Sequence, residues 1–251
     1  MPGLFRRTVF DLVELTLVVA FVAFTAFRAG GTYYSPIDTA RLSKKYGPHK
    51  YSHNVEEWVV RDFFQDRRDG IFVDIGSADA RKGSNTYYLE SALNWSGIAV
   101  DALQEHATSY REHRPRTKFF ASFVAERSGE SVALYVSPTR TESSSYLRDF
   151  AAFYATSPLA KRTVKTITLD DLLGRAGLTR IDFLSMDIEM AEPRALAGFD
   201  IDRFRPSLIC IEAHPPVRQQ ILDYFGKHGY VLVGQYLWTD LVSLYFKPLN
   251  D

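Results

Sequence analysis

Residues 70–101 read Gly-Ile-Phe-Val-Asp-Ile-Gly-Ser-Ala-Asp-Ala, then a polar loop, Asn-Thr-Tyr-Tyr-Leu-Glu-Ser-Ala-Leu-Asn and Trp-Ser-Gly-Ile-Ala-Val-Asp. The apolar run 71–75 contains β-branched residues, which is typical of a strand buried on both faces of a parallel sheet. Gly76 ends this run, and Ser84 or Asn85 can cap a following helix. The stretch therefore predicts a strand, a tight turn, a helix and a second strand, in the manner of an α/β fold.

Two positions in this stretch predict ligand binding. The turn at Gly76 lets a ligand approach the backbone closely, and amides at a helix N-terminus can receive an anionic or polar group. Asp101 stands at the end of the second strand, where nucleotide-binding α/β proteins keep an acid for ribose hydroxyls. Ala78 and Ala80 occupy positions where a dinucleotide fingerprint would have its later glycines. The stretch indicates half of a nucleoside-binding crevice and disfavours a plain NAD site.

The motifs of residues 70–101 resemble those of the FkbM-type S-adenosylmethionine-dependent methyltransferases. A second block supports the resemblance: Thr-Ile-Thr-Leu-Asp-Asp-Leu-Leu at 166–173, followed by Ile-Asp-Phe-Leu-Ser-Met-Asp-Ile-Glu-Met-Ala-Glu at 181–192. The later part of this block is similar to the family's Asp-x-Glu-Gly-x-Glu motif. The resemblance runs from about Tyr51 to Phe246, and therefore leaves only the N-terminus uncovered.

The chain departs from the family pattern at three positions. Ala80 replaces a usual glycine, Asp101 a usual glutamate, and Met190 the glycine after Asp-x-Glu. These departures concern individual ligand contacts more than they concern the fold.

The resemblance implies an α/β fold with a Rossmann-like, seven-stranded class I methyltransferase sheet and S-adenosylmethionine as cofactor. The loop after a third strand commonly borders the adenine, although a phenylalanine there is equally explained as a core residue. The residues predicted to bind the cofactor are Asp74, Gly76, Ser77, Asp79, Asn85, Thr86, Asp101, Ala102, Ser122, Phe123 and Asp187.

The rest of the pattern alternates strands and helices until a closing antiparallel pair. Residues 132–136 are expected to return as a hairpin from the third strand. Residues 139–145, polar and rich in hydroxyl groups, are interpreted as a mobile lip over the site or simply as a loop. Strands are predicted at 118–125, 132–136, 181–188, 207–211, 230–236 and 241–246.

The N-terminus differs from the rest of the chain. Residues 9–27 are nearly all apolar and, at about 1.5 Å per helical residue, approach the roughly 30 Å thickness of the hydrocarbon layer. We therefore predict an N-terminal membrane-associated helix as an anchor in 1–30, a linker in 31–50 and a methyltransferase domain in 51–251.

Two acids complicate the anchor, because Asp11 and Glu14 lie on one helix face and carboxylates are expensive in lipid. Arg7 could neutralise them, a partner helix in a homo-oligomer could cover them, or they could lie at the level of the headgroups. A cleaved signal peptide is disfavoured because the acids interrupt its apolar region. A buried core helix at the edge of the domain is the third interpretation.

Charge indicates orientation and partners. Basic residues after the apolar run outnumber those before it, which predicts a protein of the cell membrane with its globular domain in the cytoplasm. The expected partners are the lipid bilayer and a small-molecule or lipid-linked acceptor. Thirty basic and thirty acidic residues balance, which argues against a dedicated nucleic-acid binder. The basic residues compared are Arg28, Arg41, Lys44, Lys45 and Lys50 against Arg6 and Arg7.

Four polar residues are predicted to meet at the carboxyl edge of the sheet. The period of two along a strand places Asp187 with Glu189, and Glu212 with His214, at the ends of neighbouring strands. Asp187, Glu212 and His214 could bind Mg²⁺ or Mn²⁺, which would lower the pKa of an acceptor hydroxyl. Alternatively, His214 takes the hydroxyl proton itself, with Asp187 and Glu189 as its catalytic partners.

A structural explanation of the same cluster stays open, in which some of these residues cap the helix near Ala191 and pair with Arg194. His53 and Glu57 are alternative residues that could face a substrate, or they belong to an ordinary helix start. The single Cys210 lies in an apolar run and is interpreted as a buried small side chain.

The favoured function is an S-adenosylmethionine-dependent O-methyltransferase at the cytoplasmic membrane face, acting on a glycan, glycolipid or other lipid-linked hydroxyl compound. One alternative is a nucleotide-dependent oxidoreductase on the same architecture. The other is a catalytically inactive membrane scaffold of the same fold.

Overall fold

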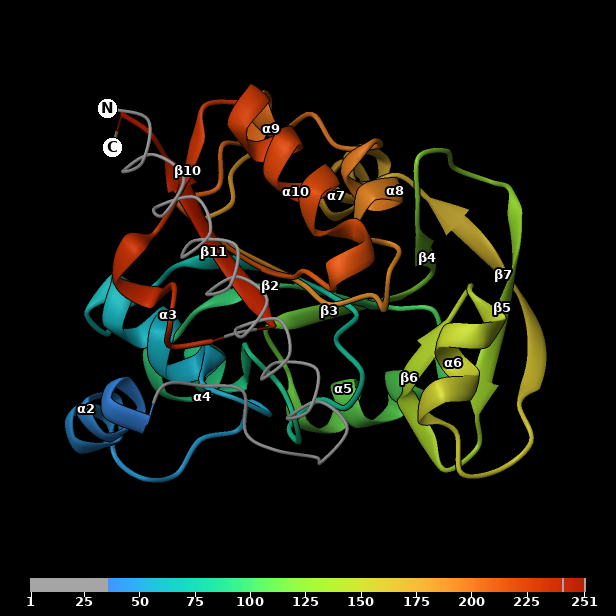
Figure 1. The fold of residues 1–251 in the computed structure, drawn as a ribbon, viewed down its shortest axis with the longest axis horizontal. Helices are drawn as coiled ribbons and strands as arrows, with labels where there is room; N and C mark the ends of the chain where they lie inside the picture. The colour runs from blue at the N-terminus through green and yellow to red at the C-terminus, as the bar shows by residue number, and fades with distance from the viewer. Residues whose placement is uncertain (1–35, 241, 251) are drawn as a thin grey trace, which may run out of the picture.

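The computed structural model describes residues 36–240 and 242–250. Its centre is a seven-stranded sheet in the order β10-β11-β9-β8-β1-β2-β3, in which β11 alone runs antiparallel to its neighbours (Figure 1). The predicted α/β fold with a seven-stranded sheet is confirmed. The strands are β1 (Ile71–Ile75), β2 (Ser96–Asp101), β3 (Thr117–Ala121), β8 (Phe183–Met186), β9 (Leu208–Glu212), β10 (Tyr230–Leu232) and β11 (Ser243–Pro248).

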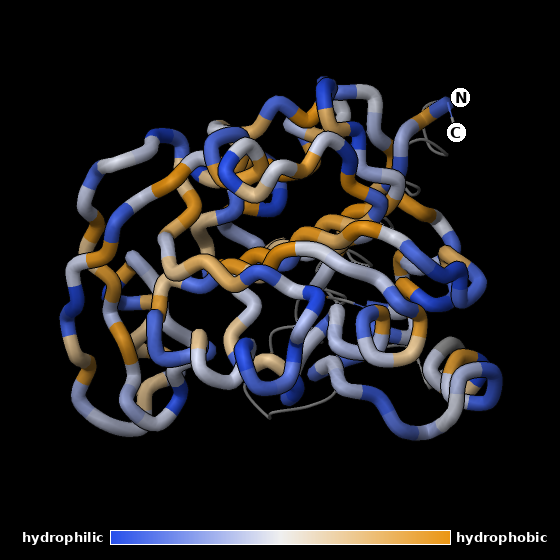
Figure 2. Tube along the Cα trace, turned by 180° about the vertical axis from the view of Figure 1, so that it is seen from behind, coloured by the Kyte–Doolittle hydropathy of each residue, from blue (hydrophilic) through white to orange (hydrophobic). Residues whose placement is uncertain are grey.

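Strand β1 lies in the middle of the sheet because both of its faces are apolar. Phe72 packs into one core, whereas Val73 and Ile75 pack into the other, as the alternation of side chains along a strand requires. Figure 2 shows the apolar positions concentrated along these central strands.

Helices cover both faces of the sheet (Figure 1). One core contains Leu172 and Ile221 from helices above the sheet, and the other contains Trp58 and Leu89 from helices below it. The upper helices are α7 (Leu169–Ala176), α8 (Glu192–Leu196), α9 (Ile201–Phe204) and α10 (Pro215–Lys227). The lower elements are α3 (Glu56–Phe64), α4 (Tyr87–Leu93), η1 (Gln104–His106) and α5 (Ala107–His113), and η2 (Gly234–Tyr236) connects β10 to β11.

A second, four-stranded sheet lies to the right in Figure 1, in the order β4-β7-β5-β6. It is inserted between β3 and α7 and carries one helix of its own. Its elements are β4 (Phe123–Val124), β5 (Ser131–Ser137), β6 (Arg140–Ser145), α6 (Arg148–Tyr154) and β7 (Ala160–Ile167).

This second sheet corrects three expectations. Residues 132–136 form β5, which pairs with β6 and β7 instead of returning beside the third strand of the main sheet. Residues 139–145, interpreted as a lip or a loop, include the strand β6. The predicted third strand divides into β3 and β4, because β4 leaves the main sheet to pair with β7.

Helix α2 (Pro36–Tyr46) lies within the predicted linker 31–50. Its Leu42 is fully buried, and its Lys45 Nζ lies 2.9 Å from a carboxylate oxygen of Asp62 on α3. This part of the linker is therefore packed against the domain. The predicted anchor at 9–27 lies outside the described residues. Among the helices of the described residues, none combines the length and hydropathy needed to cross a bilayer.

Candidate active site

The turn after β1 brings two strands of the sheet into close backbone contact. Gly76 has φ of +81°, and a Cβ built on it would lie 1.7 Å from the carbonyl oxygen of Asp187. Its amide nitrogen donates to the carbonyl oxygen of Val100 over 2.8 Å. The ends of β1, β2 and β8 meet at this residue, and only a glycine fits there.

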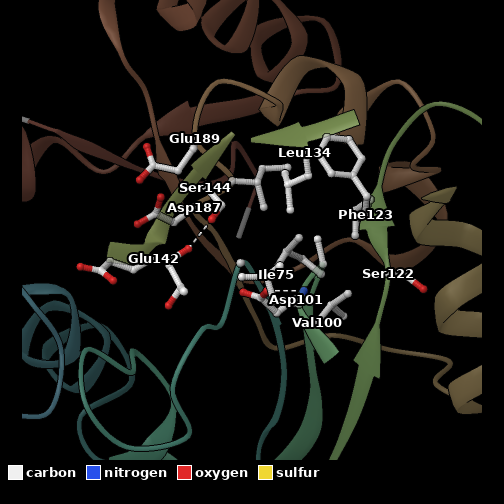
Figure 3. Close-up of a pocket in the computed structure, with 16 residues that line it drawn as sticks. Ile75, Val100, Asp101, Ser122, Phe123, Leu134, Glu142, Ser144, Asp187 and Glu189 are labelled. Carbon is white, nitrogen blue, oxygen red and sulfur yellow. Dashed lines mark hydrogen bonds between the residues drawn. The ribbon is translucent and has the colours of Figure 1, made fainter. Parts of the chain in front are cut away.

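A first cavity opens beside Gly76, between the strand ends and the second sheet. Figure 3 shows carboxylates from Glu142, Asp187 and Glu189 on one side of it and the side chains of Phe123 and Leu134 on the other. One polar and one apolar wall suit a ligand with a polar part and an aromatic base. Five predicted cofactor residues besides Gly76 line this cavity: Asp101, Ala102, Ser122, Phe123 and Asp187.

Asp101 is held in place by backbone amides at the end of β2. Its Oδ2 accepts a hydrogen bond from Ala78 N at 3.1 Å, and its Oδ1 accepts one from Leu103 N at 2.8 Å. Burial raises the pKa of this carboxyl group. Each carboxylate oxygen keeps a second lone pair. Asp101 is thus fixed at the cavity wall with acceptor capacity left for ligand hydroxyls.

Replacing Asp101 by alanine is expected to weaken the binding of S-adenosylmethionine at least several-fold. A hydrogen bond to a charged group contributes about 1.5–3 kcal/mol, roughly a tenfold to hundredfold effect. Calorimetric titration measures this loss, and Asp101→Glu, which restores the family's usual acid, should recover most of it. Unchanged isotherms for a folded Asp101→Ala protein would remove Asp101 from the site.

A second cavity adjoins the first, and both are lined by Gly76, Glu142, Asp187 and Glu189. Asp74, Ser77 and Asn85 of the predicted cofactor set also line the second cavity. The amide of Asn85 donates to the hydroxyl of Ser185 over 3.0 Å, which fixes it against β8.

Two predicted cofactor residues line neither cavity. Thr86 is fully buried and donates from Oγ1 to Asp74 over 2.7 Å. Asp79 accepts hydrogen bonds from the amides of Arg81 and Lys82 through Oδ1. Both residues shape the loop between β1 and α4, and in this structure their role is to hold that loop.

The structure brings together the four polar residues predicted at the carboxyl edge. His214 Nε2 lies 3.1 Å from Glu212 Oε2 and 3.8 Å from Glu189 Oε2. The carboxyl groups of Asp187 and Glu212 are within hydrogen-bonding reach of each other. All four residues line the second cavity.

This crowding of carboxyl groups shifts their proton affinities. The Asp187 side chain is exposed to the cavity but surrounded by protein elsewhere, and this burial, with the nearby charge of Glu189, raises its pKa to about 6. Burial also raises the pKa of Glu212 well above its usual value, and Asp187 adds to the shift. The cluster therefore holds protons near neutrality or binds a compensating cation.

Glu192 is a further member of this cluster and is not among the residues predicted from the sequence. It is fully buried beneath the edge, its Oε1 accepts from Ile188 N at 3.0 Å, and burial raises its pKa to about 8. Its place as the last acid of the Asp-x-Glu-Met-x-Glu block was the signal that could have found it. Arg194 pairs with Glu126 at 2.9 Å, which contradicts the part of the structural explanation that paired the edge residues with Arg194.

Two triads of this edge offer ligand atoms close enough for one metal ion. They are Glu189, Glu212 and His214, and Asp187, Glu192 and Glu212, with the atoms of each triad within 4.8 Å of one another. Carboxylate oxygens with one imidazole are a donor set that Mg²⁺ and Mn²⁺ accept. The residues therefore fit such an ion.

The second sheet is attached to this edge at two points. Ser145 Oγ donates to the carbonyl oxygen of Glu189 over 2.7 Å, where Glu189 and Met190 have φ of +54° and +80°. The ring of Phe150 on α6 lies 5.0 Å from that of His214, edge to face. The inserted sheet consequently helps to fix the backbone of Glu189 and the ring of His214.

The two alternative substrate-facing residues separate in the structure. His53 lines the second cavity and packs its ring against Gly83. Glu57 is 1% exposed and accepts from Tyr51 N at 2.8 Å, so it fixes the entry to α3. Only His53 can meet a substrate here.

Comparison with known proteins adds a family to this geometry. No curated protein sequence matches the chain significantly. The methyltransferase FkbM domain matches residues 74–232, from β1 to β10.

Solved structures with a similar arrangement share little sequence. A precorrin-6y C5,15-methyltransferase from Geobacter metallireducens is 12% identical over 78% of this chain and 88% of its own, with a TM-score of 0.43. A TehB-like S-adenosylmethionine-dependent methyltransferase from Corynebacterium glutamicum is 11% identical over 85% of this chain and 100% of its own, with a TM-score of 0.45. An O-methyltransferase from Bacillus cereus in complex with S-adenosylhomocysteine is 11% identical over 83% of this chain and 87% of its own, with a TM-score of 0.40.

The matched domain covers more than half of the chain, and its span includes the Gly76 turn, Asp101 and the acidic edge. On this basis the protein belongs to the FkbM family and is an S-adenosylmethionine-dependent methyltransferase.

Proposed function

We propose that the protein transfers the methyl group of S-adenosylmethionine to a hydroxyl oxygen of a glycan, glycolipid or other lipid-linked acceptor. The observation that carries this proposal is the edge formed by Glu212 and His214, which lies in a cavity continuous with that of Asp101. A base beside an electrophilic methyl group is what attack by a hydroxyl oxygen requires.

The four shared residues, Gly76, Glu142, Asp187 and Glu189, mark the place where donor and acceptor would meet. S-Adenosylmethionine supplies an electrophilic methyl group on sulfur. The acceptor oxygen forms the new C–O bond as the C–S bond breaks, and S-adenosylhomocysteine leaves. The acceptor's proton passes to the imidazole of His214, and Glu212 stabilises the imidazolium at 3.1 Å. Alignment does most of the remaining work, because no covalent intermediate is needed.

A divalent ion is the second version of this mechanism, favoured by the two carboxylate-rich triads. The predicted ligand set of Asp187, Glu212 and His214 is divided between the two triads, and Glu189 takes the place of Asp187 beside Glu212 and His214. Mg²⁺ or Mn²⁺ held by Glu189, Glu212 and His214 would orient the acceptor hydroxyl and lower its pKa. In this version His214 is a metal ligand and no longer the base. A carboxylate that does not bind the metal, or a water molecule, then takes the proton of the acceptor hydroxyl. Chelation distinguishes the two versions.

Family membership argues against a nucleotide-dependent oxidoreductase. It also argues against the inactive scaffold. Ala80, which departs from the family pattern, is fully buried against Ala99 and Tyr110, so this departure is a packing feature and no sign of lost activity.

The proposal is tested by incubating the purified protein with S-adenosylmethionine labelled in its methyl group and a membrane extract. We expect label to enter the glycan or glycolipid fraction as a methyl ether, identified by mass spectrometry, with equimolar S-adenosylhomocysteine. Label found only on nitrogen or carbon atoms would contradict O-methyl transfer.

We further propose that residues 9–27 anchor the protein in the cell membrane with the methyltransferase domain in the cytoplasm, where a homo-oligomer could cover Asp11 and Glu14. The apolar run and the basic residues that follow it support this proposal. Leu237 and Trp238 are exposed, and they follow Tyr236, whose hydroxyl donates to Asp62 beside α2. Such apolar and aromatic side chains would suit contact with the membrane–water interface.

The full-length protein is expected in the membrane fraction, resistant to carbonate washing. Burial of an apolar segment yields roughly 25 cal/mol per Å². A shortened protein that starts at Tyr33 should be soluble without detergent. Recovery of the full-length chain in the soluble fraction after lysis would show that the anchor prediction is wrong.

A further inference from the structure

The second cavity has a wall that shares only Glu142 with the first cavity. This wall comes from the inserted sheet, by way of β6, α6 and the turn that follows α6. It faces the strand ends that carry Glu212 and His214. An acceptor must therefore lie between this wall and the catalytic edge.

Most of the side chains that line the second cavity carry a polar atom. Among the described residues that line it, the side chains without a polar atom are Ala78, Phe153, Ala155 and Val242, beside two glycines. An acyl chain would cover the other groups without hydrogen-bonding them, at about 1–3 kcal/mol for each buried group. The cavity consequently suits a molecule that has both hydroxyl groups and apolar C–H faces better than it suits the hydrocarbon part of a lipid.

The charges of the lining disfavour an anionic acceptor. Six carboxyl groups, those of Glu56, Asp74, Glu142, Asp187, Glu189 and Glu212, face only two side chains of permanent positive charge, Lys82 and Arg140. Burial keeps part of this set protonated, yet the groups that stay ionised would still repel a phosphate or carboxylate close to the reacting hydroxyl.

The wall itself has the parts of a sugar-binding surface. Phe153 is 57% exposed although it lines the cavity, and Tyr154 stands beside it at 5.1 Å between ring centroids. An exposed aromatic face accepts the C–H face of a pyranose ring by dispersion. Arg140 and Glu142 are two residues apart on β6 and therefore point to the same side, with 3.5 Å between Nε and Oε1. Such planar groups can each bond two neighbouring hydroxyls.

We propose that this wall is an acceptor subsite for an uncharged pyranose. The sugar ring stacks on Phe153, and two adjacent hydroxyls bind Arg140 and Glu142. A further hydroxyl then reaches the Glu212 and His214 edge. Any lipid joined to the sugar remains outside the cavity. This inference rests on the proposed O-methyl transfer and names the class of group that receives the methyl.

Saturation-transfer NMR on the full-length protein in detergent, with S-adenosylhomocysteine bound, tests the subsite. The probes are methyl glycosides of hexoses, deoxyhexoses and N-acetylhexosamines, together with hexose 6-phosphates and 1-hexanol. At least one methyl glycoside should receive saturation on its ring protons, more strongly than any phosphate. Phe153→Ala and Arg140→Ala should each reduce that signal at least fivefold, whereas Phe153→Tyr should retain it.

Leu147→Ala is the matched control, since Leu147 is 36% exposed at the start of α6 but does not line the cavity. The subsite is overturned if no glycoside is saturated, if Phe153→Ala leaves the signal unchanged, or if a phosphate or 1-hexanol binds in preference. Calorimetry with S-adenosylhomocysteine distinguishes failure of the sugar subsite from failure of the proposed methyl transfer. When it binds and the sugars do not, the subsite is wrong and methyl transfer stands; when it does not bind, both proposals fail.

Discussion

Replacing His214 by alanine is expected to reduce methyl transfer about a hundredfold or more, while the affinity for S-adenosylmethionine changes little. A positioned general base contributes roughly 10²–10⁴ in rate, and a metal ligand has an effect of similar size. The imidazole lies 3.1 Å from Glu212 and lines the acceptor cavity, whereas Asp101 and Ala102 line the adjoining one. Steady-state rates and calorimetry on the same samples measure both quantities.

Chelation then decides between the two versions of the edge. If a chelator abolishes turnover and Mn²⁺ or Mg²⁺ restores it, Glu212 and His214 are metal ligands. If a chelator has no effect and His214→Ala is inactive, the imidazole is the base. His228→Ala is a suitable control, because His228 caps the C-terminal end of α10, pairs with Asp202 of α9 at 2.8 Å and lines neither cavity. Near-normal turnover by His214→Ala on an identified acceptor would contradict both versions and leave His53 as the remaining candidate.

Replacing Gly76 by alanine is expected to reduce cofactor affinity about a hundredfold or more and to lower the thermal midpoint of unfolding. The added Cβ would lie 1.7 Å from the carbonyl oxygen of Asp187, and φ of +81° is unfavourable for any other residue. Both strands must separate to relieve such a contact with backbone, which disturbs the ends of β1 and β8 together. Calorimetric titration and differential scanning calorimetry measure the two effects.

Gly226→Ala provides the matched control for this substitution. Gly226 lies inside α10, and a Cβ added there would meet nothing within 4 Å. The change should therefore stabilise the protein by up to about 1 kcal/mol, since alanine favours a helix interior over glycine. A Gly76→Ala protein that binds S-adenosylhomocysteine as tightly as this control would show that the strand ends are not as close as the structure places them.

Much of the main sheet could be predicted from sequence because its strands are short apolar runs that end at glycines or acids. In the run 71–75, Phe72 and Val73 face opposite cores, and Asp74 is the single polar residue. The apolar pattern is therefore enough to predict a strand. Asp74 is itself buried against Thr86. Strong local patterns and tertiary structure agree there.

The inserted sheet could not be predicted as well, because its strands lack such a pattern. Strand β6 has the sequence Arg-Thr-Glu-Ser-Ser-Ser, which resembles a loop, and β7 exposes Arg162 and Thr163. Pairing with β5, together with the burial of Ser143 and Ser145, makes β6 a strand. Tertiary contacts of this kind override local preference.

The site shows the same division. Asp187, Glu189, Glu212 and His214 do meet as predicted, but only Glu212 lies in a strand: Asp187 and Glu189 follow the end of β8, and His214 precedes α10. The shared carboxyl edge of neighbouring parallel strands brings them together, rather than the period of two. Glu192 escaped notice because it belongs to the turn and helix beneath the edge. A second case is Arg114, a fully buried side chain that bonds to Glu90 at 2.6 Å and supports the loop carrying Ser84 and Thr86. The sequence around Arg114 predicts only the end of a charged helix.

The attachment of the inserted sheet to the catalytic edge has a consequence for selectivity. Ser145 holds the carbonyl oxygen of Glu189, and Phe150 packs against His214, so a molecule that displaces α6 also displaces the groups that react. A poorly fitting acceptor could then still bind, yet it would find the imidazole misaligned. Discrimination among acceptors would appear in kcat rather than in KM, so binding identifies the class of acceptor while turnover identifies the true substrate.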